Sequence, residues 1–301
     1  MPDSAGAAGA TEGEWITVRV VRAAQSGKGP RLTRLPDTDP HTGAPTGPPT
    51  GPARLLRRGP DAVARMADRY PEAKIEADDL SVLAELRPLF GDRLRRVPAA
   101  FDDTTEAAVE ALADQDAALP GGARMTIVPT PALIAIDVDL SSGVSGRGGK
   151  SLTHMDANAA ILPALARAIR LRNLGGAIVV DLAGLSPRRR AALGTAFAAA
   201  VAEDPVPTRF LGFSALGLAE LLRDRIHPPL HELLASPHAS GLEALRTLAK
   251  TIAADPRTPS ELTCAPAIAE ALERDASALA DLARLAGRPL ILRVDRTMPG
   301  A

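Results

Sequence analysis

Two apolar segments in the middle of the chain decide its fold class: ALIAIDVDL at residues 132–140 and GAIVVDL at residues 176–182. Both are short runs rich in β-branched residues, a pattern that predicts buried strands. Helical patterns follow each of them, at about 153–172 and at about 187–203. Because apolar strands alternate with helices, we expect an α/β fold for residues 120–232.

Three further segments complete this predicted α/β block. MTIVPT at 125–130 and TRFLGFS at 208–214 are short and apolar, which predicts two more strands. The leucine-rich segment at 215–226 predicts a helix. A glycine-rich loop at 141–149 separates the first aspartate-bearing strand from the helix that follows it.

The flanking segments predict smaller units. Residues 14–35 begin with alternation at Ile16, Val18 and Val20, which predicts a β-hairpin. Residues 36–52 contain six prolines and predict an exposed linker. The expected division is a hairpin and Pro/Gly-rich linker at 1–52, a mostly helical acidic subdomain at 53–119, the α/β core at 120–232, and a small α+β domain at 233–301.

Within these flanking units we expect a helix at 103–118, two more at about 241–253 and 266–286, and a final strand at 289–294. The arginine cluster at 93–96 is interpreted as a solvated face.

The composition excludes several classes of protein. The chain has 301 residues, of which 46% are hydrophobic, so it is not wholly disordered. Its net charge of −1 excludes a polycation that coats nucleic acid. The single cysteine, Cys264, excludes an intramolecular disulfide framework and a cysteine-rich zinc site. With no secretory signal and no apolar run near 20 residues, we expect a cytoplasmic protein without a membrane partner.

The candidate chemistry lies at the ends of the two deciding strands. Asp137 and Asp139 are two residues apart in one strand, so they point the same way, and Asp181 ends the other strand. If the strands are neighbours, three carboxylates converge, and this arrangement is costly unless a hard cation such as Mg²⁺ or Mn²⁺ neutralises it. The alternative is that Asp137 or Asp181 serves as a helix cap or a turn residue.

The glycine-rich loop offers a competing hypothesis. Gly149, Lys150 and Ser151 match the end of a phosphate-binding P-loop, but that motif needs glycine at position 144, where Val144 stands. A nucleotide hydrolase that uses Lys150 is therefore a distant alternative.

Three longer segments resemble, in order, the catalytic core of the ribonuclease E/G family. They are LPGGARMTIVPTPALIAIDVDLSSG at 119–143, NAAILPALARAIRLRNLGGAIVVDLAGL at 158–185 and RFLGFSALGLAELLRDR at 209–225. RLRNLGG at 170–176 matches the family almost letter for letter. Residues 18–33 resemble the last strands of the family's OB-fold domain, and residues 262–294 resemble its small terminal domain.

The resemblance implies an endoribonuclease for single-stranded RNA with a deoxyribonuclease-I-like catalytic subdomain. Asp137 and Asp181 fall on the family's two metal-holding aspartates, where Mg²⁺ would activate a water. Asp139 stands where the family has asparagine and adds negative charge to the catalytic site. The residues that we expect at the RNA backbone, each with a solvated face as the alternative, are Lys28, Arg31, Arg147, Lys150, Arg170 and Arg172.

The sequence also departs from the family pattern. Gly184 stands where the family has a second acid after the Asp181 strand. Most of the OB-fold, the segment that senses a 5′-monophosphate and the Cys-x-x-Cys zinc link are missing. We therefore expect no zinc, and any homo-oligomer should form without a zinc bridge. A non-catalytic RNA-binding or regulatory relative of the family is the alternative to a reduced enzyme.

Overall fold

The computed structural model describes residues 9–24, 28–35, 51–140 and 150–298. The chain divides into two compact units. The first contains Met1–Ala23 and Gly29–Ala111, and the second contains Ala24–Lys28 and Leu112–Ala301. Among the described residues, no helix has both the length and the apolar character that a bilayer crossing requires.

The first unit contains the predicted hairpin. Strands β1 (Val18–Arg22) and β2 (Arg31–Arg34) pair antiparallel, with Val20 opposite Leu32. The prediction of a two-stranded hairpin is confirmed.

The rest of the first unit is helical with two short strands. Its elements are α1 (Ala62–Arg69), β3 (Ile75–Ala77), α2 (Leu80–Phe90), β4 (Leu94–Arg96) and α3 (Asp103–Glu110). Strands β3 and β4 pair parallel, and α2 connects them, so this part of the chain contains a small sheet beside its helices. Leu83, Leu86 and Leu94 form its core with Ala77. Arg93 is not a solvated residue, because its guanidinium donates hydrogen bonds to three backbone carbonyls near the end of α1.

The second unit is built around a six-stranded mixed sheet, here called the central sheet. Its order is β5-β6-β7-β8-β10-β9. The strands are β5 (Asp116–Ala118), β6 (Arg124–Pro129), β7 (Ile134–Asp139), β8 (Gly176–Asp181), β9 (Thr208–Phe213) and β10 (Ala219–Arg223). Among the described strands of this sheet, only β7 and β8 pair parallel. Helix α4 (Lys150–Leu171) provides the crossover that parallel neighbours require.

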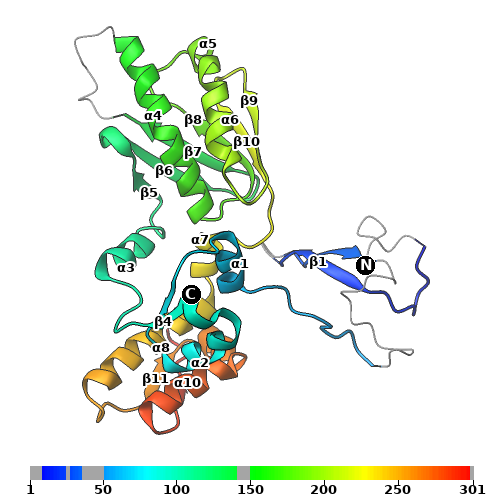
Figure 1. The fold of residues 1–301 in the computed structure, drawn as a ribbon, viewed down its shortest axis with the longest axis vertical. Helices are drawn as coiled ribbons and strands as arrows, with labels where there is room; N and C mark the ends of the chain where they lie inside the picture. Colours follow the sequence, from blue (N-terminus) through cyan, green and yellow to red (C-terminus); the bar gives the residue numbers. More distant parts are fainter. Residues whose placement is uncertain (1–8, 25–27, 36–50, 141–149, 299–301) are drawn as a thin grey trace. The chain divides into compact units, whose positions relative to one another are not determined.

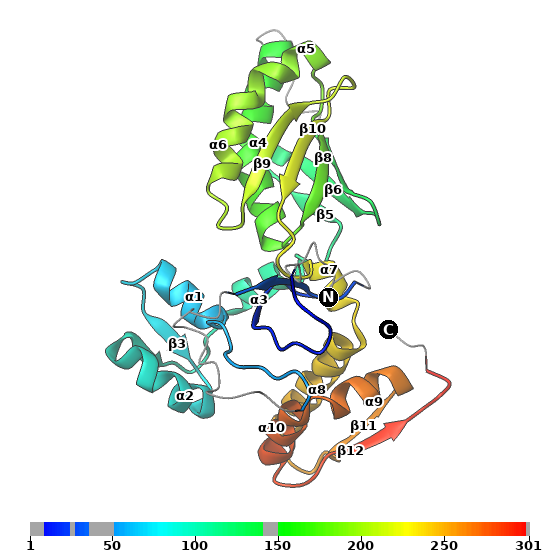
Figure 2. The same cartoon turned by 90° about the vertical axis from the view of Figure 1, so that its right-hand side faces the viewer.

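One face of the central sheet is covered by helices. Figures 1 and 2 show α4 and α6 (Gly194–Ala202) on one side of the strands, with the short helix α5 (Pro187–Arg190) at the end of the sheet. The side chains that fill this interface come from every second position of the strands, including Ile136, Val138, Ile178 and Val180. The intervening positions face the other side and include the aspartates of β7 and β8. The predicted mixed α/β class is confirmed for this region.

The sequence prediction for residues 215–226 is wrong. The expected helix at 215–226 is instead strand β10, which pairs antiparallel with β8 on one side and β9 on the other. The physical reason is the spacing of the buried side chains, because Ala219, Leu221 and Arg223 alternate with less buried neighbours at period two. Leucine-rich composition alone does not separate this strand from a helix.

The C-terminal part of the second unit is α+β. It contains α7 (Leu230–Leu234), α8 (Pro237–Ala254), β11 (Glu261–Cys264), α9 (Pro266–Glu273), α10 (Ala276–Ala286) and β12 (Ile291–Val294). The predicted helix at 266–286 is broken at Asp275, whose side chain accepts a hydrogen bond from the backbone of Ala278 and so begins α10. Similarly, the helix expected at 103–118 ends at Glu110, and its last residues form β5. Strands β11 and β12 pair parallel.

Asp275 makes the stability of this part dependent on pH. The hydroxyl of Ser277, the ring of His238 and the amide of Ala278 hydrogen-bond to its carboxylate, and together they lower its pKa from 3.8 to about 2. Because the folded pKa lies below the unfolded one, this contribution is complete above about pH 4 and is lost as the pH falls through 2.

We therefore predict that the midpoint of urea denaturation falls less steeply for Asp275→Asn than for the wild type as the pH is lowered from about 4 to 2. Asparagine keeps the capping acceptor, so the comparison isolates the charge. Asp281→Asn, a change to an exposed acid of the same helix, is the control. An acid limb in Asp275→Asn as steep as that of the wild type would contradict the prediction.

Candidate functional site

The two aspartates selected from the sequence are direct neighbours in the central sheet. Asp137 on β7 and Asp181 at the end of β8 are register partners on parallel strands. Adjacent strands lie about 4.8 Å apart, and in-register residues point to the same face. Asp137 is exposed, and the Asp181 side chain is 49% exposed. The structure therefore presents two accessible carboxylates side by side on the face opposite the helices.

The same row of residues continues across two more strands. Thr126 on β6 is the register partner of Asp137, and Asp116 on β5 is the partner of Thr126. The Thr126 hydroxyl donates a hydrogen bond of 2.6 Å to Asp116 Oδ1. A third carboxylate thus lies in this row, but a threonine separates it from the pair and occupies one of its oxygens.

Asp139 does not join the pair. It lies one pleat further along β7, on the same face, and its register partner is Arg124 on β6. The pairing between β7 and β8 ends at Asp137 and Asp181, so Asp139 extends past the end of β8. Among the described residues, no group of three acidic, histidine or cysteine side chains is arranged to hold a metal ion. The expected convergence of three carboxylates is therefore corrected to a pair.

Arg190 is a site residue that the sequence analysis missed. Its Nη1 donates a hydrogen bond of 2.6 Å to Asp181 Oδ1 and one of 3.0 Å to the carbonyl of Gly217, and its Nε donates to the carbonyl of Leu185 at 2.9 Å. The Arg190 side chain is only 12% exposed. The available signal was the run of three arginines at 188–190, but the sequence does not say which of them turns inward.

The loop after β8 leaves no room for a side chain at Gly184. This residue has φ +69°, and a Cβ built on it would overlap Nδ1 of His154 on α4. The His154 Nδ1–H donates to the Gly184 carbonyl at 3.2 Å, and the Asn158 side-chain amide donates to the Ala183 carbonyl at 2.9 Å. Two side chains of helix α4 therefore hold this loop by hydrogen bonds, and the imidazole of His154 fills the space beside Gly184.

The RLRNLGG motif at 170–176 has a structural role. Asn173 lies in the turn after α4 and has φ +48°. Its amide nitrogen donates to the carbonyls of His227 and Pro228, and its oxygen accepts from Arg223. Gly176 has φ +91°, and a Cβ there would overlap the guanidinium of Arg225. The motif thus sets the entry into β8 and ties it to β10.

A buried ion pair supports this turn. Arg223 on β10 donates to Asp204 at 2.8 Å, and the two side chains are 2% and 6% exposed. Burial alone would raise the pKa of Asp204, but the hydrogen bonds from Arg223, Val206 and Thr208 outweigh it and hold the pKa below its usual value. The hydrogen bonds that the Asp204 carboxylate accepts thus offset the cost of its burial.

The predicted RNA-contact residues are found in different environments. Lys28 and Arg31 are exposed, and Arg170 is half-buried. Arg172 is 6% exposed, and its guanidinium donates to the carbonyl of Asp114 at 3.4 Å, so it faces the protein and not a ligand. Burial lowers its pKa. Arg147 and the side chain of Lys150 lie outside the described residues, as does the rest of the glycine-rich loop considered for a P-loop.

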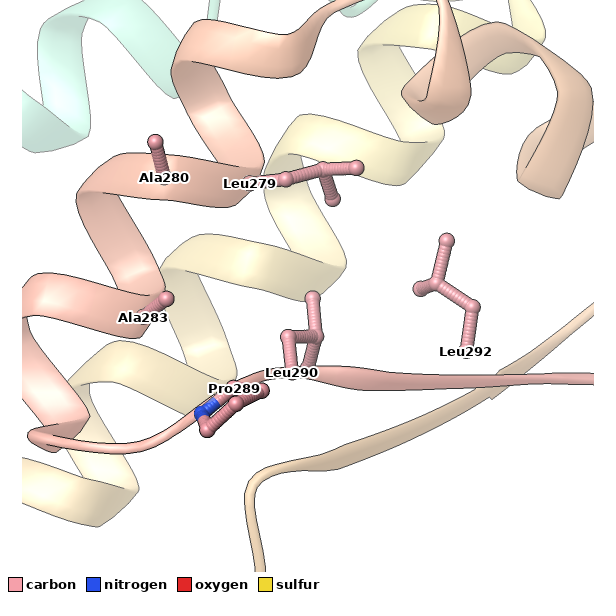
Figure 3. A pocket seen from close by; sticks show the side chains of 6 residues that line it. All are labelled: Leu279, Ala280, Ala283, Pro289, Leu290 and Leu292. Atoms are coloured by element: carbon pink, nitrogen blue, oxygen red, sulfur yellow. The ribbon is translucent and has the colours of Figure 1, made fainter.

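Two cavities in the C-terminal part of the second unit lie away from this pair. Figure 3 shows the lining of one, a cavity of about 420 Å³ formed by Leu279, Ala280, Ala283, Pro289, Leu290 and Leu292. Its walls are apolar and offer no acid, base or nucleophile. A second cavity of about 460 Å³ lies between α8 and β11. Neither is lined by Asp137 or Asp181, so the candidate site is on the open face of the sheet.

The fold and the site define a mixed α/β domain with an accessible pair of carboxylates on adjacent parallel strands. Comparison with known proteins adds the family. The model of the Ribonuclease E/G family matches residues 89–226. Residues 89–226 are thus similar to that family, and the resemblance seen in the sequence is confirmed for this region.

Three relatives illustrate the extent of the match. Ribonuclease E of Escherichia coli (strain K12) is 30% identical over 167 residues, which cover 53% of this chain and 16% of that protein. Ribonuclease G of the same strain is 28% identical over 193 residues, covering 59% and 39%. A ribonuclease E/G-like protein, chloroplastic, of Arabidopsis thaliana is 32% identical over 149 residues, covering 47% and 15%. The chain thus spans between 15% and 39% of the length of these relatives. The expected cytoplasmic location stays a prediction.

The buried pair of Arg223 and Asp204 contributes to the stability of the second unit. Arg223→Met should lower the free energy of unfolding by about 3–5 kcal/mol, because it leaves the charge of Asp204 buried without its partner. Urea denaturation measures the change, with Arg209→Met on the neighbouring strand β9 as the exposed control. A loss no larger than that of the control would contradict the structural role of the pair.

The backbone at Gly184 leaves little space for a larger residue. Gly184→Ala should cost about 1–3 kcal/mol of stability, because it combines a positive φ with the overlap on His154. In the double variant with His154→Ala, the loss should be smaller than the sum of the two single losses, since the overlap is relieved while the strain stays. Strictly additive losses would show that the two residues do not share this space.

Proposed function

We propose that the chain is a Mg²⁺-dependent endoribonuclease that cleaves single-stranded RNA, with a deoxyribonuclease-I-like catalytic subdomain over residues 120–232. The observation that carries the proposal is the in-register pair of Asp137 and Asp181, exposed on the open face of a sheet that lies within the family match. Two adjacent carboxylates repel each other and gain from a shared cation.

The donor set of the pair fits Mg²⁺. Both ligands are carboxylate oxygens, and this ion commonly takes one or two carboxylates and completes its shell with water and substrate phosphate. Mn²⁺ accepts the same ligands. When bound, Mg²⁺ would supply an activated water and stabilise the charge that develops on the scissile phosphate. A cysteine-based zinc site is not expected, because the only cysteine, Cys264, is buried and its burial raises its pKa.

The residues of the chain have separate tasks in this proposal. Asp137 and Asp181 hold the cation on the exposed face, and Arg190 fixes the orientation of Asp181. Asp139 adds negative charge one pleat away. Lys28, Arg31 and Arg170, together with Arg147 and Lys150, neutralise phosphates of the RNA backbone. Arg172 is left out of this group because it is buried.

The four-part division at residues 52, 119 and 232 and an assembly without a zinc bridge are part of the proposal. The compartment is proposed to be the cytoplasm.

One observation favours a second candidate, a non-catalytic RNA-binding or regulatory relative. Gly184 takes the position of the family's second acid, and the His154 imidazole fills the space beside it. A chain that has lost one acid of a hydrolytic site can keep RNA affinity without cleavage.

Cleavage of a fluorescent single-stranded RNA tests the two candidates. Asp137→Asn and Asp181→Asn should each lower the Mg²⁺-dependent rate by at least about 100-fold, because each removes a charged ligand while keeping the shape of the side chain. Asp116→Asn is the matched control, since this acid lies in the same row but outside the pair. The assay is run at low salt, with Mg²⁺, Mn²⁺ or EDTA, to limit the screening of phosphate contacts.

Each outcome has a distinct meaning. Metal-dependent cleavage that both substitutions abolish and Asp116→Asn retains supports the enzyme. Cleavage that survives both substitutions would contradict the assignment of the pair. RNA retention by the wild type with no cleavage under any metal condition would favour the non-catalytic relative.

A further inference from the structure

We propose that Arg190 is a positioning residue that occupies one oxygen of Asp181 and weakens the affinity of the Asp137–Asp181 pair for a divalent cation. The inference rests on the proposed function, since it concerns the same pair. It assigns to Arg190 both the orientation of Asp181 and the control of cation occupancy.

The anchoring of Arg190 shows which partner positions the other. Its guanidinium donates hydrogen bonds to the carbonyls of Leu185 and Gly217, which lie on two different loops. These two bonds are independent of its contact to the Asp181 carboxylate. Its side chain is 12% exposed, whereas that of Asp181 is 49% exposed. A side chain held by two backbone groups in a sheltered place is the fixed partner, so Asp181 takes its orientation from Arg190.

The contact also divides the two oxygens of Asp181. Oδ1 accepts the 2.6 Å hydrogen bond from Arg190, a short charge-assisted contact. Oδ2 is the oxygen that this contact leaves to a cation. A cation bound by the pair is thereby limited to one oxygen from Asp181 unless it displaces Arg190.

Charge gives the direction of the effect. Asp137 and Asp181 carry −2 together, and Arg190 brings the local sum to −1. In the absence of a cation, the guanidinium relieves the repulsion between the two in-register carboxylates. A bound divalent cation is repelled by the same guanidinium at short range. Arg190 therefore stabilises the cation-free protein and lowers cation affinity.

The adjacent arginines provide the matched control. Arg188 and Arg189 belong to the same short helix α5 and are exposed. Removing the charge of Arg189 changes the net charge of the protein by the same amount as removing that of Arg190, and it leaves the contact to Asp181 in place. The difference in cation affinity between the two variants therefore separates the effect of the contact to Asp181 from the effect of the net charge of the protein.

The test is a titration of the full chain with Mn²⁺. The electron paramagnetic resonance signal of free Mn²⁺ measures how much of the ion is bound. Arg190→Gln should bind Mn²⁺ about 10-fold more tightly than the wild type, and Arg189→Gln should match the wild type. In EDTA, Arg190→Gln should melt at a lower temperature than the wild type, and Mn²⁺ should raise its melting temperature by more. Circular dichroism checks that Arg190→Gln is folded. If it is not folded, Arg190→Met takes its place as the test variant.

The outcomes separate this inference from the proposed function. In one outcome, Asp181→Asn binds Mn²⁺ more weakly than the wild type, and Arg190→Gln binds it no more tightly than the wild type. This outcome overturns the role of Arg190 and leaves the metal site intact. Binding that is absent from both the wild type and Arg190→Gln overturns both proposals. Binding that appears only when Arg190 is replaced supports the inference in its strongest form.

Discussion

The parallel register between β7 and β8 is the constraint on which the rest of the structure depends. It places Asp137 directly beside Asp181. Parallel neighbours need a crossover, and α4 supplies it by packing Ile161, Leu165 and Ile169 against the covered face of the sheet. A slip of one residue in β8 would turn Asp181 toward this apolar core and separate the pair.

Several contacts prevent such a slip. The turn at Asn173 and Gly176 needs two residues of positive φ, and its hydrogen bonds to Arg223 connect it to β10 on the far side of β8. At the other end of β8, Arg190 holds Asp181, while Asn158 and His154 hold the loop that follows. Both ends of the strand are thus fixed by hydrogen bonds to other elements. The cost of two adjacent carboxylates is offset locally by one guanidinium.

The sequence predicts the main part of this arrangement and misses its finer contacts. Short apolar runs rich in β-branched residues predict strands, and the aspartates near their ends select Asp137 and Asp181. The strand at 219–223 was predicted as a helix, since leucine-rich segments of this length fit either period until their neighbours are known. Arg190 was missed for a related reason: its inward orientation depends on the carbonyls of Leu185 and Gly217, and the latter is distant in sequence.

The motif that most strongly suggests the family gives another example. RLRNLGG at 170–176 suggested RNA contacts through Arg170 and Arg172, whereas the structure uses Asn173 and the glycines for the turn and buries Arg172. Positive φ values and buried partners are tertiary properties, so the sequence alone could not assign them. A motif can therefore identify a family reliably through residues whose role is to build the site.

The central claim is that Asp137 and Asp181 form one cation site. The most direct measurement is carbon-detected nuclear magnetic resonance of the protein labelled at its aspartate carboxyl carbons, titrated with small amounts of Mn²⁺. The account predicts that the resonances of Asp137 and Asp181 broaden together at the lowest Mn²⁺ concentrations, before that of Asp116. Broadening of only one of the two, or of both only after Asp116, would contradict it.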